Sequence, residues 1–189
     1  MKSFPVKIVI CGKDEIDAHA QSGLTHMLSI ENPQTPKATP AWFKGDHRQL
    51  LFNDIESKEE ARILNLIAPR KPHLQEILNY GREISFLPGG GARGMLVHCH
   101  AGICRSTEAS YAIIAQYLGK GRAHQALELV LQVRPAALPN RLMVKFADEL
   151  LGFDGELFQP LQKLRYPYNQ LVNEWFAKGR AGNEDGFRK

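Results

Sequence analysis

The segment HCHAGICRST at positions 98–107 constrains this chain more than any other stretch of its sequence. It follows the short apolar run MLV at 95–97, which predicts a strand, and leads into STEASYAIIAQYLG at 106–119, which predicts a helix. A strand that passes through a tight loop into a helix gathers the N–H groups of the loop at the positive end of the helix dipole. The segment therefore predicts an anion-binding loop, in which Gly102 allows the chain to bend back on itself.

Three side chains of this segment fit phosphoryl transfer through a covalent intermediate. A helix N-terminus and a nearby arginine lower the pKa of a cysteine thiol, so Cys99 is expected to be a nucleophilic thiolate. Arg105 offers a planar fork of donors that matches two oxygens of a phosphoryl group. Ser106 can donate a hydrogen bond to the thiolate and make it a better leaving group in a second step. The loop residues expected to bind the substrate are His100, Ala101, Gly102, Ile103, Cys104 and Arg105.

A metal site is one alternative interpretation of the same segment. His98, Cys99, His100 and Cys104 could in principle supply four zinc ligands. Adjacent residues of an extended segment point to opposite sides, however, and the sequence holds no second cluster of Cys and His. We therefore expect no metal and no other cofactor. A buried cysteine that stands near a surface arginine by chance is the remaining alternative.

Strands and helices alternate along the rest of the chain. Apolar, β-branched runs predict strands at 6–11, 24–30, 48–55 and 95–99. Helical patterns occur at 13–23, 106–119, 122–132 and 140–152. A further helix is predicted after a capping box formed by Ser57 and Glu60, ahead of Ile63, Leu64 and Ile67. Another begins at Pro72 and carries Leu74, Ile77 and Leu78 on its inner face. This order predicts an α/β fold with a central, mostly parallel sheet flanked by helices and a helix-rich C-terminal half.

The 189 residues suit one domain with a short appendage. We expect a domain over residues 1–152 and a C-terminal helical extension with a flexible tail over 153–189. Within the extension, Pro167 is expected to begin an amphipathic helix that carries Leu171, Val172, Trp175 and Phe176, and PGGGARG at 88–94 reads as a flexible connector.

Charge and cysteine usage narrow the class of partner. The net charge of +4 favours an anionic substrate, but Lys and Arg are scattered, which argues against a nucleic-acid partner. Three cysteines at irregular spacing imply no disulfide framework. No apolar stretch has the length of a membrane span, and the N-terminus lacks the apolar core of a signal peptide, so we expect a cytoplasmic protein with no membrane partner. The sequence predicts no particular oligomeric state.

The central segment also resembles a known family. His98-Cys99, five residues and then Arg105-Ser106 match every fixed position of HCxxGxxR[ST], the signature of the cysteine-based protein tyrosine phosphatases. GLTHMLSIENP at 23–33 resembles the strand segment that opens dual-specificity phosphatase domains, and VRPAALPN at 133–140 resembles the turn after their active-site helices. The resemblance covers about residues 5–152. It implies a phosphatase-like fold and hydrolysis of phosphotyrosine, with phosphoserine and phosphothreonine as further substrates, in a phosphorylated protein or a small phosphoester.

The resemblance further implies a general acid on a mobile loop that follows an earlier strand. A poor oxygen leaving group needs a proton as the P–O bond breaks. LLFNDIES at 50–57 places a carboxylate just past an apolar strand, so Asp54 is the predicted general acid and Glu56 the alternate. A turn residue or a helix N-cap is the plainer interpretation of Asp54.

Other activities remain open at the level of sequence. A phosphatase for phosphoinositides or another non-protein phosphoester is one alternative, although such relatives often carry lysines in the loop and HAGIC at 100–104 has none. A catalytically weak phosphate-binding module is another, and redox chemistry such as arsenate reduction or sulfur transfer is a third. Cys104 reproduces the C-x4-C-R-S spacing of the low-molecular-weight tyrosine phosphatases, which suggests either a reversible disulfide with Cys99 or a small packing residue.

Overall fold

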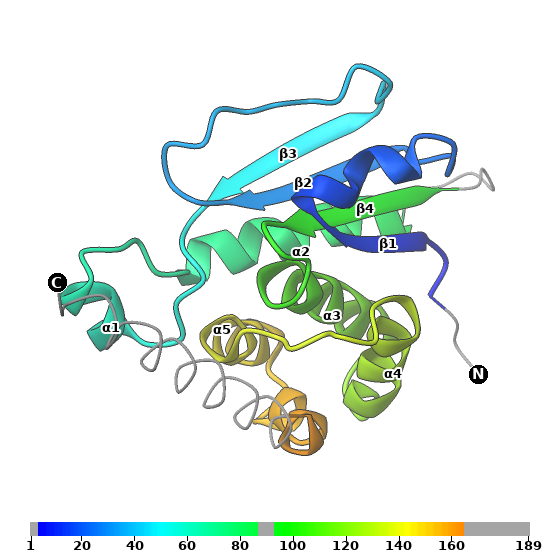
Figure 1. The fold of residues 1–189 in the computed structure, drawn as a ribbon. Coiled ribbons are helices and arrows are strands. Elements are labelled where there is room, and N and C mark those ends of the chain that lie inside the picture. The colour runs from blue at the N-terminus through cyan, green and yellow to red at the C-terminus, as the bar shows by residue number, and fades with distance from the viewer. Residues whose placement is uncertain (1–3, 87–92, 165–189) are drawn as a thin grey trace, which may run out of the picture.

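Four parallel strands form the centre of the fold, in the order β1-β4-β2-β3 (Figure 1). The computed structural model describes residues 4–86 and 93–164. The strands are β1 (Lys7–Gly12), β2 (His26–Glu31), β3 (Asp46–Leu51) and β4 (Gly94–Cys99). All four predicted strands are confirmed, although β3 begins earlier and ends earlier than the range 48–55.

Strand β4 lies inside the sheet, and every one of its residues is buried. Burial on both faces suits a parallel strand with a continuous apolar run. In register, Gly12 of β1 pairs with Cys99, and Ser29 of β2 pairs with His98. The C-terminal residue of β4 therefore stands at the carboxyl edge of the sheet, where ligands of open α/β sheets bind.

Helices α2 to α5 cover one face of the sheet (Figure 1). The α-helices are α1 (Lys58–Ile63), α2 (Lys71–Phe86), α3 (Arg105–Leu118), α4 (Ala123–Val133) and α5 (Arg141–Leu151). Met95, Val97 and Cys99 point into this helical core, because alternate residues of a strand share a face. The helix predicted from Pro72 is confirmed, and Leu74, Ile77 and Leu78 are buried as expected.

The second face of the sheet carries a thinner cover. A 3-10 helix, η1 (Lys13–His19), replaces the ordinary short helix expected at 13–23. Together with Phe43 from the proline-rich loop, it packs over Val9, Met27 and Leu96. His98 shares this face with Leu96, so the His98 and Cys99 side chains lie on opposite sides of the sheet.

The segment after Ser57 departs from its predicted form. Ser57 does cap α1, since its Oγ accepts a hydrogen bond from the Glu60 N–H at 3.0 Å. The helix ends at Ile63, however, and the apolar side chains that the sequence places after the capping box, Ile63, Leu64 and Ile67, are exposed. The apolar spacing was that of an amphipathic helix, but the chain leaves the helix before those positions can share a face.

Residues beyond α5 continue the helical core. Two 3-10 turns follow, η2 (Glu156–Phe158) and η3 (Pro160–Lys163). Phe153, Leu157 and Leu161 are buried in the same core as α3 to α5. The predicted division of the chain at residue 152 stays a prediction, and the connector at 88–92 and the helix from Pro167 lie outside the described residues.

Among the helices of the described ranges, none is long and apolar enough to span a bilayer. The cytoplasmic location expected from the sequence stays a prediction.

Candidate active site

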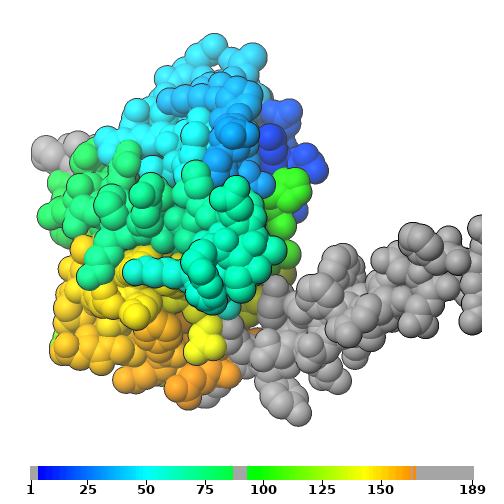
Figure 2. All heavy atoms as spheres, turned by 90° about the vertical axis from the view of Figure 1, so that its left-hand side faces the viewer, coloured from blue at the N-terminus to red at the C-terminus, as the bar shows by residue number. Residues whose placement is uncertain are grey.

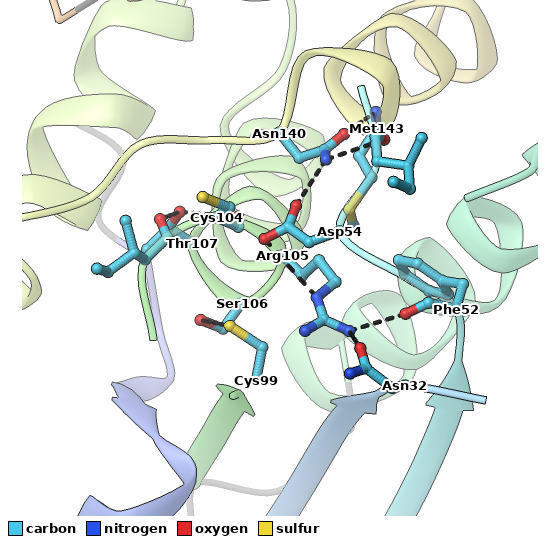
Figure 3. Close-up of polar contacts among 12 residues, drawn as sticks. Asn32, Phe52, Asp54, Cys99, Cys104, Arg105, Ser106, Thr107, Asn140 and Met143 are labelled. Atoms are coloured by element: carbon cyan, nitrogen blue, oxygen red, sulfur yellow. Dashed lines mark hydrogen bonds and ion pairs between the residues drawn. The ribbon is translucent and has the colours of Figure 1, made fainter. Parts of the chain in front are cut away.

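Cys99 ends the central strand and is nearly inaccessible, with 1% of its surface exposed. Its Sγ lies 3.3 Å from the Oγ of Ser106, which belongs to the first turn of α3 (Figure 3). The sheet and helix thus bring together the two residues that the sequence predicted as nucleophile and hydrogen-bond donor.

The loop between β4 and α3 is fastened from its outer side through its carbonyl groups. The Lys13 N–H donates to the His100 carbonyl at 3.0 Å, and the Leu138 N–H donates to the Ile103 carbonyl at 2.9 Å. The Arg134 guanidinium donates to the carbonyls of Ala101 and Gly102, at 3.1 Å each. In a planar trans peptide the N–H points opposite to the preceding carbonyl. The N–H groups of residues 101–104 are therefore turned away from these outer partners, which leaves them available to an anion.

Arg134 stabilises this loop through hydrogen bonds to its carbonyl groups, and the sequence did not predict this role. Its Nε and Nη2 donate to the loop carbonyls, and its Nη1 lies 2.9 Å from a carboxylate oxygen of Glu15. Glu15 in turn accepts a hydrogen bond from the Gly12 N–H at 2.6 Å. The sequence signal was limited to VRPAALPN at 133–140, which indicated a turn but no contact with the loop.

Gly102 is the one loop position where a side chain cannot fit. Its φ is +72°, in the left-handed region that favours glycine. A Cβ at this position would lie 2.5 Å from the carbonyl carbon of Cys11 and from the nitrogen of Gly12. The loop is therefore packed directly against the end of β1.

Arg105 opens α3 and is buried, with 3% of its surface exposed. Its Nη1 donates to the side chain of Asn32 at 3.0 Å and to the carbonyl of Phe52 at 2.8 Å, which places the guanidinium beside the ends of β2 and β3 (Figure 3). Its buried Nε has no hydrogen-bond partner within residues 4–86 and 93–164. A buried donor without a partner is costly, so this group is suited to an anionic ligand.

Asp54 lies in the loop after β3 and reaches the same site. One carboxylate oxygen accepts a hydrogen bond from the Asn140 Nδ2 at 2.8 Å, and the other lies 3.8 Å from the Arg105 Nε. Asn140 is fully buried and also caps α5, because its Oδ1 accepts a hydrogen bond from the Met143 N–H at 3.0 Å (Figure 3). The sequence predicted Asp54 here but gave no sign that Asn140 would hold it.

Glu56, the alternate candidate, is turned toward another partner. Its carboxylate accepts a hydrogen bond from the Arg141 N–H at 3.2 Å, at the start of α5. It therefore supports the approach of α5 to this loop, whereas the Asp54 carboxylate faces Arg105.

The remaining loop side chains differ in exposure. His100 and Ala101 are exposed at the rim, Gly102 is buried, and Ile103 and Cys104 are half-buried. Burial, together with the nearby carboxylate of Asp54, raises the pKa of the Cys104 thiol. The hypothesis of a reversible Cys99–Cys104 disulfide stays a prediction.

His98, the residue before Cys99 on β4, belongs to a row of hydrogen-bonded side chains with Ser29 and His47. Its Nε2 lies 2.5 Å from the Ser29 Oγ, which lies 2.7 Å from the Nε2 of His47. Burial lowers the pKa of His98 to about 4, so the ring is neutral at neutral pH.

Comparisons with known proteins agree with this geometry. No protein-family model matches the chain. A curated relative, MAP kinase phosphatase with leucine-rich repeats protein 2 of Dictyostelium discoideum, is 28% identical over 138 residues, which make up 73% of this chain and 16% of the relative. The match thus spans about a sixth of the relative's length.

Solved structures of similar fold cover most of the chain. DUSP15 matches 86% of this chain and 95% of its own, with a TM-score of 0.58 and 20% identity. The Yvh1 phosphatase domain from Chaetomium thermophilum gives a TM-score of 0.55 at 17% identity, over 82% of this chain and 95% of its own. PTPMT1 in complex with PI(5)P gives a TM-score of 0.53 at 14% identity, over 80% of this chain and 92% of its own. These matches confirm the resemblance seen in the sequence: the chain has the fold of the dual-specificity phosphatases, a branch of the cysteine-based protein tyrosine phosphatases.

Proposed function

We propose that this chain is a cysteine-dependent phosphatase that hydrolyses phosphotyrosine, and also phosphoserine and phosphothreonine, in phosphorylated proteins. The observation that carries the proposal is the loop at 100–104, whose carbonyls at 100–103 are hydrogen-bonded on the outer side while Cys99 and Arg105 flank it. Amide donors, a buried guanidinium and a cysteine at one point are the requirements of phosphoryl transfer to sulfur.

In the first step, the Cys99 thiolate attacks phosphorus and the ester P–O bond breaks. The loop amides and Arg105 hold the equatorial oxygens, where negative charge is spread in the transition state. The orphan Nε of Arg105 gains a partner when a phosphoryl oxygen binds. Asp54 gives its proton to the departing oxygen.

In the second step, a water molecule attacks the phosphocysteine, and the S–P bond breaks. Asp54, now a carboxylate, takes the proton from this water. Ser106 donates a hydrogen bond to the departing sulfur, from the distance of 3.3 Å that separates its Oγ from the Cys99 Sγ. Every group in this cycle belongs to the chain, so we expect EDTA to leave the activity unchanged.

A phosphoinositide phosphatase is the second candidate function. The structural similarity to PTPMT1, which was solved with PI(5)P, favours it. The absence of lysine from HAGIC at 100–104 weighs against it, because a polyanionic headgroup calls for more cations than Arg105 alone supplies. A phosphate-binding module without activity is less well supported, since the chain has Cys99, Arg105 and Asp54, the residues proposed as nucleophile, phosphate ligand and acid.

The proposal is tested with a small aryl phosphate, a set of phosphopeptides and a set of phosphoinositides. We expect hydrolysis of the aryl phosphate, inhibition by vanadate, and higher kcat/KM for phosphopeptides than for phosphoinositides. Cys99→Ser should abolish turnover and retain phosphate binding. Full activity of Cys99→Ser, or activity that EDTA removes, contradicts the mechanism. A higher kcat/KM for phosphoinositides than for phosphopeptides contradicts the proposed protein substrate and favours the second candidate function.

A further inference from the structure

The segment that follows the Asp54 loop exposes an unusual number of apolar side chains. Ile63, Leu64, Leu66 and Ile67 are 70%, 54%, 38% and 46% exposed. Elsewhere in the described part of the chain, only Leu51, Phe86 and Val133 are large hydrophobic residues of comparable exposure. A contiguous exposed apolar patch of this kind marks an interaction surface more often than a solvated one.

An open groove of about 570 Å³ lies along this segment. Leu66 and Ile67 form part of its apolar lining, and Lys58, Arg62 and Arg70 line it as well. No Asp or Glu is among its lining residues in the described ranges. In Figure 2, α1 and the chain after it stand out from the face turned to the viewer. We call this feature the α1 groove.

The α1 groove carries a positive charge that the protein only partly compensates. Arg62 pairs with Glu59 at 2.6 Å on the exposed surface of α1. Within residues 4–86 and 93–164, Lys58 and Arg70 form no ion pair. The complementary ligand therefore combines carboxylates with aliphatic side chains.

The α1 groove is joined directly to the loop of the proposed general acid. The Asn53 N–H donates to the carbonyl of Ile67 at 2.7 Å, and the Ile67 N–H donates to the Oδ1 of Asn53 at 3.0 Å. Asp54 is the next residue, and it faces Arg105. The Asp54 loop thus connects the proposed catalytic residues with the α1 groove, which gives a bound peptide a route from one to the other.

We propose that the α1 groove binds the part of a substrate protein that flanks the phosphorylated residue, a segment in which acidic and aliphatic side chains alternate. This inference rests on the proposed function. A peptide suits the shape better than a membrane does, because Leu66 and Ile67 line a hollow between cations. The site would give specificity through KM, since its contacts lie away from the reacting phosphorus and are made equally in the ground state and the transition state.

The test compares two phosphotyrosine peptides, one with Glu and Leu in the flank and one in which Lys replaces each Glu. Wild-type protein should show at least a tenfold lower KM for the acidic peptide, with similar kcat. The double variant Lys58→Glu/Arg70→Glu should lose this preference and leave hydrolysis of a small aryl phosphate unchanged. Leu66→Ser should raise KM for both peptides. Lys44→Glu reverses an exposed charge in the loop that precedes β3 and is the matched control. It should change neither the preference for the acidic peptide nor the hydrolysis of the aryl phosphate.

Each contrary result has its own meaning. Equal KM values for the two peptides, or an unchanged preference in the double variant, overturn the inference. A gain in peptide affinity on removing residues 165–189 would show that the chain's own C-terminal segment fills the groove. Binding to phosphatidylserine vesicles that depends on Lys58 and Arg70 would assign the groove to a membrane. If the wild-type protein fails to hydrolyse the aryl phosphate, the proposed function fails instead, and fluorescence anisotropy of the unphosphorylated peptides still decides the groove.

Discussion

At the scale of single residues, the Asp54 carboxylate is surrounded by side chains from two parts of the chain, Asn140 and the adjacent pair Cys104 and Arg105. Asn140 holds one oxygen at 2.8 Å, Arg105 lies near the other, and the Cys104 thiol lies close enough for the carboxylate to raise its pKa. The Asn140 amide donates to the Ile55 carbonyl too, at 3.2 Å, so it fixes the loop as well as the carboxylate. This contact positions the Asp54 carboxylate, and its proposed role as general acid is open to a direct test.

We predict that Asp54→Asn lowers kcat for a substrate with a poor leaving group by about 10²–10⁴-fold, because the departing oxygen then receives no proton. A good leaving group needs no proton, so the same variant should lose little activity on such a substrate. Steady-state kinetics on a series of aryl phosphates measures this leaving-group dependence. Glu56→Gln is the matched control, and an equal loss in both variants would remove the assignment of Asp54.

Glu108, in the first turn of α3, is a buried carboxyl that the proposed mechanism does not use. It is fully buried, and neither of its oxygens has a hydrogen-bond partner in the part of the chain that the structure describes. Burial raises its pKa well above the ordinary value, which means that the folded protein holds the proton more tightly than the unfolded chain does. Its contribution to stability is therefore fully present below pH 4.5 and is lost as the pH rises toward the folded-state pKa.

We predict that Glu108→Gln flattens the fall in unfolding free energy between pH 5 and pH 8, a fall of at most about 1.4 kcal/mol per pH unit for one proton. Urea unfolding at a series of pH values measures it. Glu128→Gln changes an exposed carboxyl on α4 and should leave the slope as it is in the wild type. A wild-type slope that survives in Glu108→Gln would show that another group is responsible.

At the scale of elements, the loop from β4 to α3 keeps its shape because distant elements hold its outer side. Arg134, just after α4, supplies two of these contacts, and Gly12, at the end of β1, leaves no room for a side chain at position 102. Cys99, Arg105 and Ser106 could be predicted as site residues because they lie within one contiguous motif of the sequence. Arg134 and Asn140 could not be predicted in the same way, because their contacts depend on how helices from the far end of the chain pack.

We predict that Arg134→Ala lowers kcat/KM by about 100-fold, since a small displacement of the loop amides weakens their grip on the transition state. Vanadate affinity should fall in parallel, while the dependence on the leaving group stays that of the wild type. Arg134→Lys should rescue little, because one ammonium group cannot donate in the planar fork that reaches both carbonyls. Arg122→Ala, an exposed arginine at the start of α4, serves as the control. Unchanged vanadate binding in Arg134→Ala would show that Arg134 is not a positioning residue.

Helix α1 illustrates the limit of periodicity as a guide. The sequence predicted a helix that runs on to Ile63, Leu64 and Ile67, whereas α1 ends at Ile63, the Ile67 backbone bonds to Asn53, and those three side chains are exposed. The Ser57 half of the predicted capping box is confirmed, because it depends only on residues within one turn, whereas the Glu60 carboxylate accepts from the Glu56 N–H instead of the Ser57 N–H.

At the scale of the whole molecule, alternation of strands and helices was enough to predict a parallel α/β sheet. The strand order β1-β4-β2-β3 was beyond the sequence pattern, since it is set by which strand edges meet after the helices have packed. Phe153, Leu157 and Leu161, which follow the predicted boundary at residue 152, are buried in the same core as α3 to α5. The whole arrangement places the Cys99 thiol, at the end of β4, and the Asp54 carboxyl, in the loop after β3, around the proposed anion site.

We predict a bell-shaped dependence of kcat/KM on pH, because the reaction needs one group without its proton and another with it. The acidic limb should report the nucleophile and the substrate, and the basic limb should disappear in Asp54→Asn. Initial rates across the pH range, with substrate held well below KM, give both limbs. A basic limb that persists in the variant would assign it to another group.

The most direct test of the account is to trap the intermediate. Rapid acid quenching during turnover of an aryl phosphate, followed by mass spectrometry of the digested protein, should place one phosphoryl group on the peptide that contains Cys99, and none on the same peptide of Cys99→Ser. A phosphoryl group found on another residue, or turnover that continues in Cys99→Ser, would contradict the claim that sulfur at the end of β4 attacks the phosphoester.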